Sequence, residues 1–139
     1  MQKPAIMKTT TTLLSDYEFE AVTESGHKVQ IDMRPAEEKQ GQSPTELLLS
    51  ALSGCASVDL VQMLKKRKRT VNNLKVTAEG TRREEHPRGY KHIKLHFVLE
   101  SPDAKMEEFE KLGHMAATKY CSVAGTLSSE VEHTFEIIR

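Results

Sequence analysis

The sequence has no tryptophan, only two cysteines and no excess charge of either sign. Aromatic residues make up 5% of its 139 residues, so a core must be built mostly from leucine, valine, isoleucine and methionine. Twenty basic and twenty acidic residues cancel to a formal net charge of zero. Because of this balance, we expect no general attraction to nucleic acid or to an acidic membrane surface.

Long apolar segments are missing as well. The longest uncharged apolar run, residues 47–58, has twelve residues, which is too short to cross a bilayer and fits a buried core helix. The first seven residues lack the apolar segment of a signal peptide. We therefore expect a cytoplasmic protein without a membrane partner, folded as a single domain over residues 1–139.

Several motifs for ligand chemistry are absent too. No CxxC pair occurs, which disfavours thioredoxin-like exchange, and the loops 23–28 and 81–89 lack a phosphate-binding glycine pattern. His92 and His96 fall on a strand pattern that spaces them about 13 Å apart along one face. We therefore expect no metal site and no bound cofactor. The basic run at residues 65–69 ends a helix, where cations suit the helix dipole, and we prefer this interpretation to a nucleic-acid patch.

The order of the predicted elements indicates the fold class. Alternating apolar residues predict a hairpin over residues 11–33 that turns near Gly26, a strand pair at 74–78 and 93–99, and a last strand at 131–137. A second helix is expected over residues 101–120, with Ser101 and Pro102 at its start, and a short third helix near Cys121. Strands paired as hairpins between helices predict an α+β fold with antiparallel sheets.

The first helix carries the clearest start signal in the chain. Ser43 is a good N-cap, Pro44 fits the first helical position, and Glu46 stands where a capping box needs an acid. The helix runs to the basic residues 65–69 and has apolar residues nearly all the way round. We therefore expect it to be central and covered on most sides.

The two cysteines are the best candidates for chemistry. Cys55 lies among small residues on the first helix, where a free thiol is often only a small hydrophobic group. Cys121 is expected in the first turn of a new helix, where free amide groups lower the pKa of a thiol. If the two thiols meet, one can reduce a peroxide and the other can close a disulfide. Their separation in sequence leaves this encounter open.

Two segments together resemble a known family. "SPTELLLSALSGC", followed by "KYCSVAGTL", is similar to the OsmC/Ohr family of organic hydroperoxide reductases, and within it to the YhfA-type OsmC-like branch. The resemblance covers nearly the whole chain. It implies an intertwined homodimer in which sheets wrap around long central helices, with a site at the subunit interface. It also implies that Cys55 attacks the peroxide and that Cys121 then forms a disulfide with the oxidised Cys55. The lowered pKa expected for Cys121 at a helix start would favour Cys121 as the attacking thiol, but we follow the resemblance.

Members of this family pair the first cysteine with an arginine from the N-terminal strand region and a glutamate near the start of the cysteine helix. Alignment on Pro44 and Cys55 puts Thr45 at the glutamate position, with Glu46 one residue later. Glu46 is therefore both a candidate catalytic residue and a helix cap. Arg34 is the only arginine before this helix.

The leading hypothesis is a thiol-dependent peroxidase that reduces organic hydroperoxides through Cys55 and Cys121 and serves in oxidative-stress defence. An external dithiol would return the enzyme to its reduced form. The alternative is a dimeric protein of the same fold that binds a small ligand and has no peroxidase activity.

Overall fold

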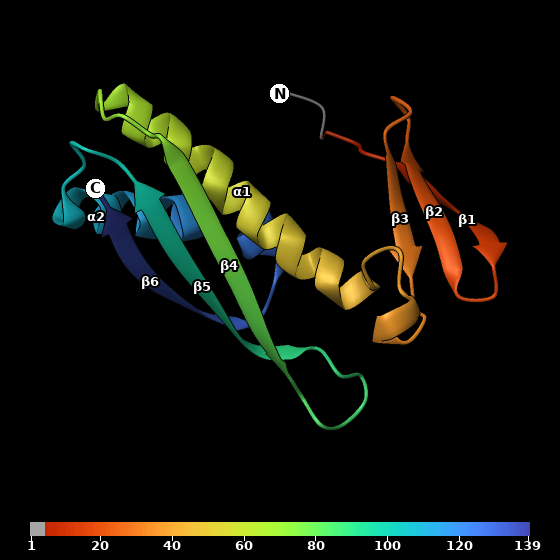
Figure 1. Cartoon of the computed structure of the whole chain (residues 1–139). Coiled ribbons are helices and arrows are strands. Elements are labelled where there is room, and N and C mark those ends of the chain that lie inside the picture. Colours follow the sequence, from red (N-terminus) through yellow and green to blue (C-terminus); the bar gives the residue numbers. More distant parts are fainter. Residues whose placement is uncertain (1–4) are drawn as a thin grey trace. The chain divides into compact units, whose positions relative to one another are not determined.

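The chain divides into two compact units, residues 1–47 and residues 48–139, in the computed structural model (Figure 1). The structure describes residues 5–139. Each unit contains one three-stranded sheet. The expected single domain over residues 1–139 stays a prediction.

The N-terminal unit is an antiparallel sheet of β1 (Thr9–Ser15), β2 (Glu18–Thr23) and β3 (Lys28–Asp32). The predicted hairpin is β2 and β3, and its turn uses Gly26 at a φ of 90°, a conformation that favours glycine. β1 was not predicted as a separate strand, because its run of four threonines and two leucines does not alternate between polar and apolar residues. The polar loop after β3 contains the short helix η1 (Ala36–Glu38).

This N-terminal sheet has no apolar core of its own. Within the described residues up to position 47, the buried side chains are the polar Asp32 and Ser43. Asp32 accepts hydrogen bonds from the backbone N–H groups of Gln40 and Arg34, which lower the pKa of its carboxyl. Five large side chains of the sheet and its flanks are exposed instead, namely Leu13, Leu14, Tyr17, Val29 and Met33, whereas Phe19, Val22 and Ile31 are half-buried. A sheet of this size needs a covered apolar face to be stable, so this unit requires a surface beyond itself.

The C-terminal unit has a sheet of β4 (Asn73–Arg82), β5 (Tyr90–Glu100) and β6 (Glu130–Ile138), with α1 (Pro44–Lys66) and α2 (Met106–Met115) on one face (Figure 1). β4 and β5 form the predicted antiparallel pair. β6 runs parallel to β5, so the expectation of purely antiparallel sheets is wrong there. The helical segment between β5 and β6 returns the chain to the end of the sheet where β5 begins, which makes the pair parallel.

α1 begins at Pro44 as predicted, after the cap residue Ser43, and ends at Lys66. It buries one stripe of every fourth residue, which consists of Leu52, Ala56, Leu60 and Leu64. Its other apolar side chains are not all covered, since Val58 is 63% exposed. The expectation that α1 is covered on most sides is therefore wrong for the single chain. By length and composition alone α1 could cross a membrane, a test that the core helix of a soluble protein also passes.

The segment after β5 differs from the single helix predicted for it. α2 begins at Met106, because the Ser101 hydroxyl accepts the N–H groups of Asp103 and Ala104 in a separate turn. The wide π-helical turn η2 (Ala116–Tyr120) follows α2. The predicted third helix is confirmed as α3 (Ser122–Thr126).

Aromatic rings join α2 to the sheet. Phe135 of β6 stacks on Phe97 with ring centroids 5.0 Å apart, and it forms a T-shaped pair with Phe109 of α2 with centroids 5.1 Å apart. Gly113 leaves room for this ring, because a Cβ atom there would lie 2.1 Å from Cε1 of Phe135. The absence of a side chain at position 113 therefore sets how closely α2 approaches β6.

We predict that Gly113→Ala destabilises the protein by about 1–3 kcal/mol, because the added methyl group must displace the ring of Phe135. Gly125→Ala is the matched control, since a Cβ atom there would have no heavy atom within 4 Å. Chemical denaturation measures both free energies of unfolding. Equal effects of the two substitutions would contradict the close packing of Gly113 on Phe135.

Candidate functional site

The structure brings together the two cysteines, which lie 66 positions apart in sequence. Cys55 is partly exposed on α1, one residue before the buried Ala56, and Cys121 is 3% exposed between η2 and α3. Both are free thiols. The Cys55 thiol is near enough to Cys121 to raise its pKa, so the two side chains are close neighbours. The pair therefore consists of one accessible and one enclosed thiol that lie close together.

Cys121 also forms the N-cap of α3. Its sulfur accepts a hydrogen bond from the N–H group of Ala124 at 3.3 Å. Burial raises the pKa of Cys121, the Ala124 N–H lowers it, and the Cys55 thiol raises it again, so that the net shift is upward. The expectation that a helix N-terminus gives Cys121 a low pKa is wrong, because burial outweighs one N–H group of a helix of five residues. A buried thiol with a raised pKa is poorly suited to attack first.

Glu46 completes the predicted capping box. Its Oε1 accepts hydrogen bonds from the backbone N–H of Ser43 at 2.9 Å and from the Ser43 hydroxyl at 2.8 Å, and it pairs with Lys39. The Lys39 ammonium and the two Ser43 groups lower the pKa of Glu46 to about 2. All contacts described for Glu46 lie within residues 39–46. They support its capping role and none of them involves a cysteine.

Arg34, the only arginine before α1, is bound within the N-terminal sheet. Its Nη2 lies 3.1 Å from Oε1 of Glu18, and its Nε lies 3.8 Å from Oδ1 of Asp32. Its described ion pairs are therefore with carboxylates of its own unit. In the part of the chain that the structure describes, no cation is in described contact with Cys55.

The other polar groups singled out in the sequence have structural partners. On β5, His92 lies 3.1 Å from Glu132 and His96 lies 2.6 Å from the hydroxyl of Thr134. The described residues contain no cluster of three or more side chains suited to hold a metal ion. In the basic run, Arg69 forms an ion pair of 2.7 Å with Glu108, which neutralises part of that charge.

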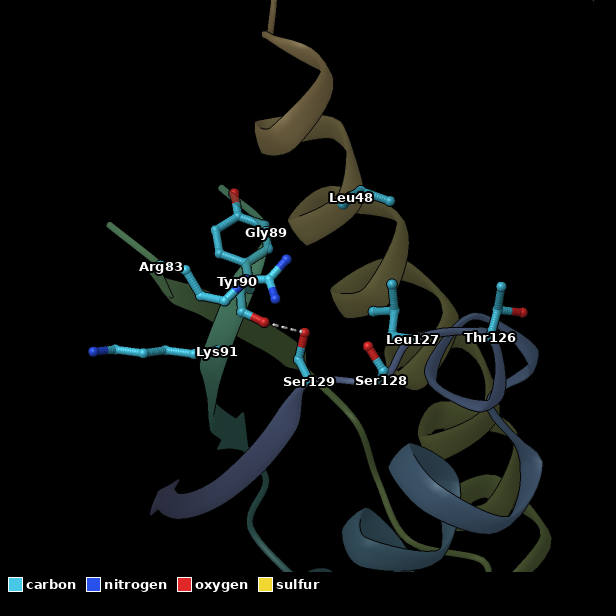
Figure 2. A pocket seen from close by; sticks show the side chains of 9 residues that line it. All are labelled: Leu48, Arg83, Gly89, Tyr90, Lys91, Thr126, Leu127, Ser128 and Ser129. Atoms are coloured by element: carbon cyan, nitrogen blue, oxygen red, sulfur yellow. Dashed lines mark hydrogen bonds between the residues drawn. The ribbon is translucent and has the colours of Figure 1, made fainter. Parts of the chain in front are cut away.

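A cavity of about 380 Å³ lies where the β4–β5 hairpin meets α1 and the end of α3 (Figure 2). This cavity was not predicted from the sequence, in which residues 81–89 indicated only a hairpin tip. The charged residue that extends into this space is Arg83. The remaining lining comes from Leu48, Gly89, Tyr90, Lys91, Thr126, Leu127, Ser128 and Ser129.

Comparisons with known proteins agree with this architecture. A family model described as OsmC-like protein matches residues 36–136. Protein YhfA of Escherichia coli (strain K12) is 35% identical over 116 residues, which cover 82% of this chain and 85% of that protein. Hydroperoxide reductase of Mycoplasma pneumoniae is 27% identical over 121 residues, with 85% and 84% covered. The crystal structure of an OsmC-like protein from Mycoplasma pneumoniae superposes with a TM-score of 0.84 at 23% identity, covers both chains completely and shares the fold.

We predict that Glu46→Gln lowers the free energy of unfolding at pH 7 by about 0.5–1 kcal/mol, since the carboxylate is half exposed and its ion pair is screened. The folded-state pKa is about 2, below the ordinary value of 4.5. The stabilisation is therefore complete above pH 4.5 and is lost as the pH falls toward 2. Denaturation of both proteins across this range measures the difference.

Glu37→Gln serves as the control, because Glu37 is exposed and has no ion pair within the described residues. A difference between wild type and Glu46→Gln that stays constant from pH 7 to pH 2 would contradict the capping role of the carboxylate.

Proposed function

The chain belongs to the OsmC-like protein family, and from this premise we propose that it is a cytoplasmic, thiol-dependent peroxidase that reduces organic hydroperoxides through Cys55 and Cys121. The observation that carries the proposal is that the fold makes these two thiols close neighbours, although 66 positions separate them in sequence. The relative named hydroperoxide reductase supports the type of reaction.

Peroxide reduction begins at Cys55. Its thiolate attacks the outer oxygen of the hydroperoxide, so that an S–O bond forms, the O–O bond breaks, and the alkoxide leaves as an alcohol after taking a proton. Cys55 is then a sulfenic acid. The sulfur of Cys121 attacks the sulfur of Cys55, the S–O bond breaks, and the hydroxyl group leaves as water with the proton of the Cys121 thiol. An external dithiol reduces the resulting disulfide and is itself oxidised.

The burial of the two thiols fits these separate roles. Cys55 is partly exposed and can meet a hydroperoxide from outside, whereas Cys121 is enclosed and can be reached from Cys55. Because Cys121 has a raised pKa, it stays a thiol until the sulfenic acid forms next to it.

The protein acts as a homodimer in this proposal. The N-terminal sheet has exposed apolar residues and no buried ones among its described side chains, and α1 exposes Val58. Each surface needs a cover, and a second copy of the chain supplies it. The second copy also supplies the environment that the single chain lacks around Cys55.

One observation favours the second candidate function, a small-ligand binding protein of the same fold. The cavity lined by Arg83 exists independently of the cysteines. The two functions differ in whether the thiols are consumed when a hydroperoxide is added.

We predict that the reduced wild-type protein loses both thiols when it is mixed with cumene hydroperoxide, because the sulfenic acid of Cys55 is resolved by Cys121. Cys55→Ser lowers the rate of peroxide consumption by at least about 100-fold, since the attacking sulfur is gone. In Cys121→Ser, one equivalent of hydroperoxide is reduced and Cys55 stops as a sulfenic acid. Thiol titration and intact-protein mass spectrometry measure these products.

Cys55→Ser must keep the size of the wild type in gel filtration for the comparison to be valid. Consumption of peroxide by Cys55→Ser at the wild-type rate would refute the assignment. Unchanged thiols in the wild type would instead support the binding protein.

A further inference from the structure

The cavity at the base of the β4–β5 hairpin has one charged side chain directed into it. Figure 2 shows the guanidinium of Arg83 extending between the ring of Tyr90 and α1, whereas the ammonium of Lys91 extends away from the same space. No carboxylate is among the lining residues that the structure describes. The electrostatic character of the cavity is therefore set by one fixed cation, and an anion is the ligand that suits it.

Arg83 is held in place by its own hairpin. Its Nη2 donates a hydrogen bond to the carbonyl oxygen of Pro87 at 2.8 Å, and its backbone N–H donates to the carbonyl oxygen of Gly89 at 2.8 Å. The guanidinium lies against Gly89, where a Cβ atom would be 3.4 Å from Nη2. Since a guanidinium has five N–H donors, most of them stay available to a ligand. A side chain fixed in this way loses little freedom on binding.

The opposite wall contributes a second donor. Ser129 donates its hydroxyl to the carbonyl oxygen of Tyr90 at 2.8 Å, which fixes the loop after α3 to β5. Thr126 donates to the carbonyl oxygen of Ser122 at 2.9 Å. The neighbouring Ser128 is exposed, and its hydroxyl has no described partner in this part of the chain. The Ser128 hydroxyl can therefore donate to an anion that Arg83 holds.

Two helices connect the cavity with the thiol pair. Leu48 lines the cavity and lies seven residues before Cys55 on α1, which places it on the same helix face and about 10 Å along the axis. Thr126 lines the cavity and lies five residues after Cys121 through α3, a rise of about 7–8 Å. A wall residue of the cavity therefore lies about two helical turns before Cys55 on α1, and another lies at the end of α3 opposite to Cys121.

We propose that this cavity binds the carboxylate of an organic hydroperoxide, so that Arg83 selects substrates whose carboxylate and peroxide groups lie about 10 Å apart. The inference rests on the proposed function and adds the class of substrate. Leu48 and Leu127 contact the chain between the two groups. Arg83 is a specificity residue in this scheme and takes no part in the cleavage of the O–O bond.

The lining favours a carboxylate over a phosphate. A single guanidinium matches the two oxygens of a carboxylate with two parallel hydrogen bonds. A doubly charged phosphate would need further cations, and the ammonium of Lys91 is directed elsewhere (Figure 2). The volume of about 380 Å³ lies within the range of small-molecule sites and fits a short chain with its head group.

The test compares 10-hydroperoxydecanoic acid with its methyl ester, which lacks the charge and keeps the chain and the peroxide. Arg83→Gln lowers kcat/KM for the acid about tenfold and leaves kcat/KM for the ester within about twofold. Lys91→Gln is the matched control, because it removes the same charge from a side chain directed away from the cavity. It leaves kcat/KM for the acid and kcat/KM for the ester each within about twofold of the wild-type values.

Equal losses for acid and ester in Arg83→Gln would overturn the proposal, and so would a loss for the acid in Lys91→Gln as large as in Arg83→Gln. Binding of decanoate by calorimetry separates this inference from the peroxidase itself. Suppose that no hydroperoxide oxidises the thiols, but decanoate binds to the wild type and not to Arg83→Gln. This result would support the carboxylate site and refute the peroxidase activity. If decanoate binds equally to both proteins or to neither, the site is refuted.

Discussion

The packing of α1 on the C-terminal sheet fixes the position of the candidate site. The helix buries every fourth residue from Leu52 to Leu64, and this stripe sets its rotation about its own axis. Cys55 precedes the buried Ala56, so its side chain is turned about 100° from the centre of the stripe. It therefore lies at the edge of the core, where it is close to Cys121 and still reaches the surface. A thiol at the centre of the buried stripe would be closed to solvent, and a thiol on the opposite face of α1 would lie too far from Cys121.

The two sulfurs also differ because the core reaches one of them and not the other. Cys121 belongs to the buried cluster, and burial dominates its pKa in spite of the N–H group that it accepts from Ala124. The position of a cysteine at a helix start is therefore a poor guide to its acidity when the helix is short and enclosed. In this chain Cys55 is the more exposed cysteine, and it is the one that we propose meets the substrate.

The features that depend on local sequence could be predicted. The capping box of Ser43 and Glu46, the hairpin around Gly26 and the alternation in β5 each rest on a few neighbouring residues, and the structure contains all three. The features that depend on distant parts of the chain could not. The parallel direction of β6 follows from the path of the preceding helices, and the true start of α2 follows from a turn around Ser101.

The candidate site divides in the same way. The two cysteines could be identified from the small residues around them and from the family motif, whereas their proximity is a property of the folded chain. The position of Arg83 in a cavity could not be predicted from the sequence, because charged residues are common at hairpin tips. The segments that form the cavity are also 35 or more residues apart in sequence. The absence of buried apolar residues in the N-terminal sheet is likewise visible only when exposure is known.

The π-helical turn η2 between α2 and α3 has a consequence for how such a protein changes in evolution. The hydrogen bonds of a π turn close one residue further along the chain than those of an α-helical turn, so a π turn holds about one residue more. Loss or gain of one residue there would swing the second sulfur about 100° around the axis while the sheet and α1 stay intact. A lineage could therefore disconnect the thiol pair, or restore it, by one codon far from the first cysteine.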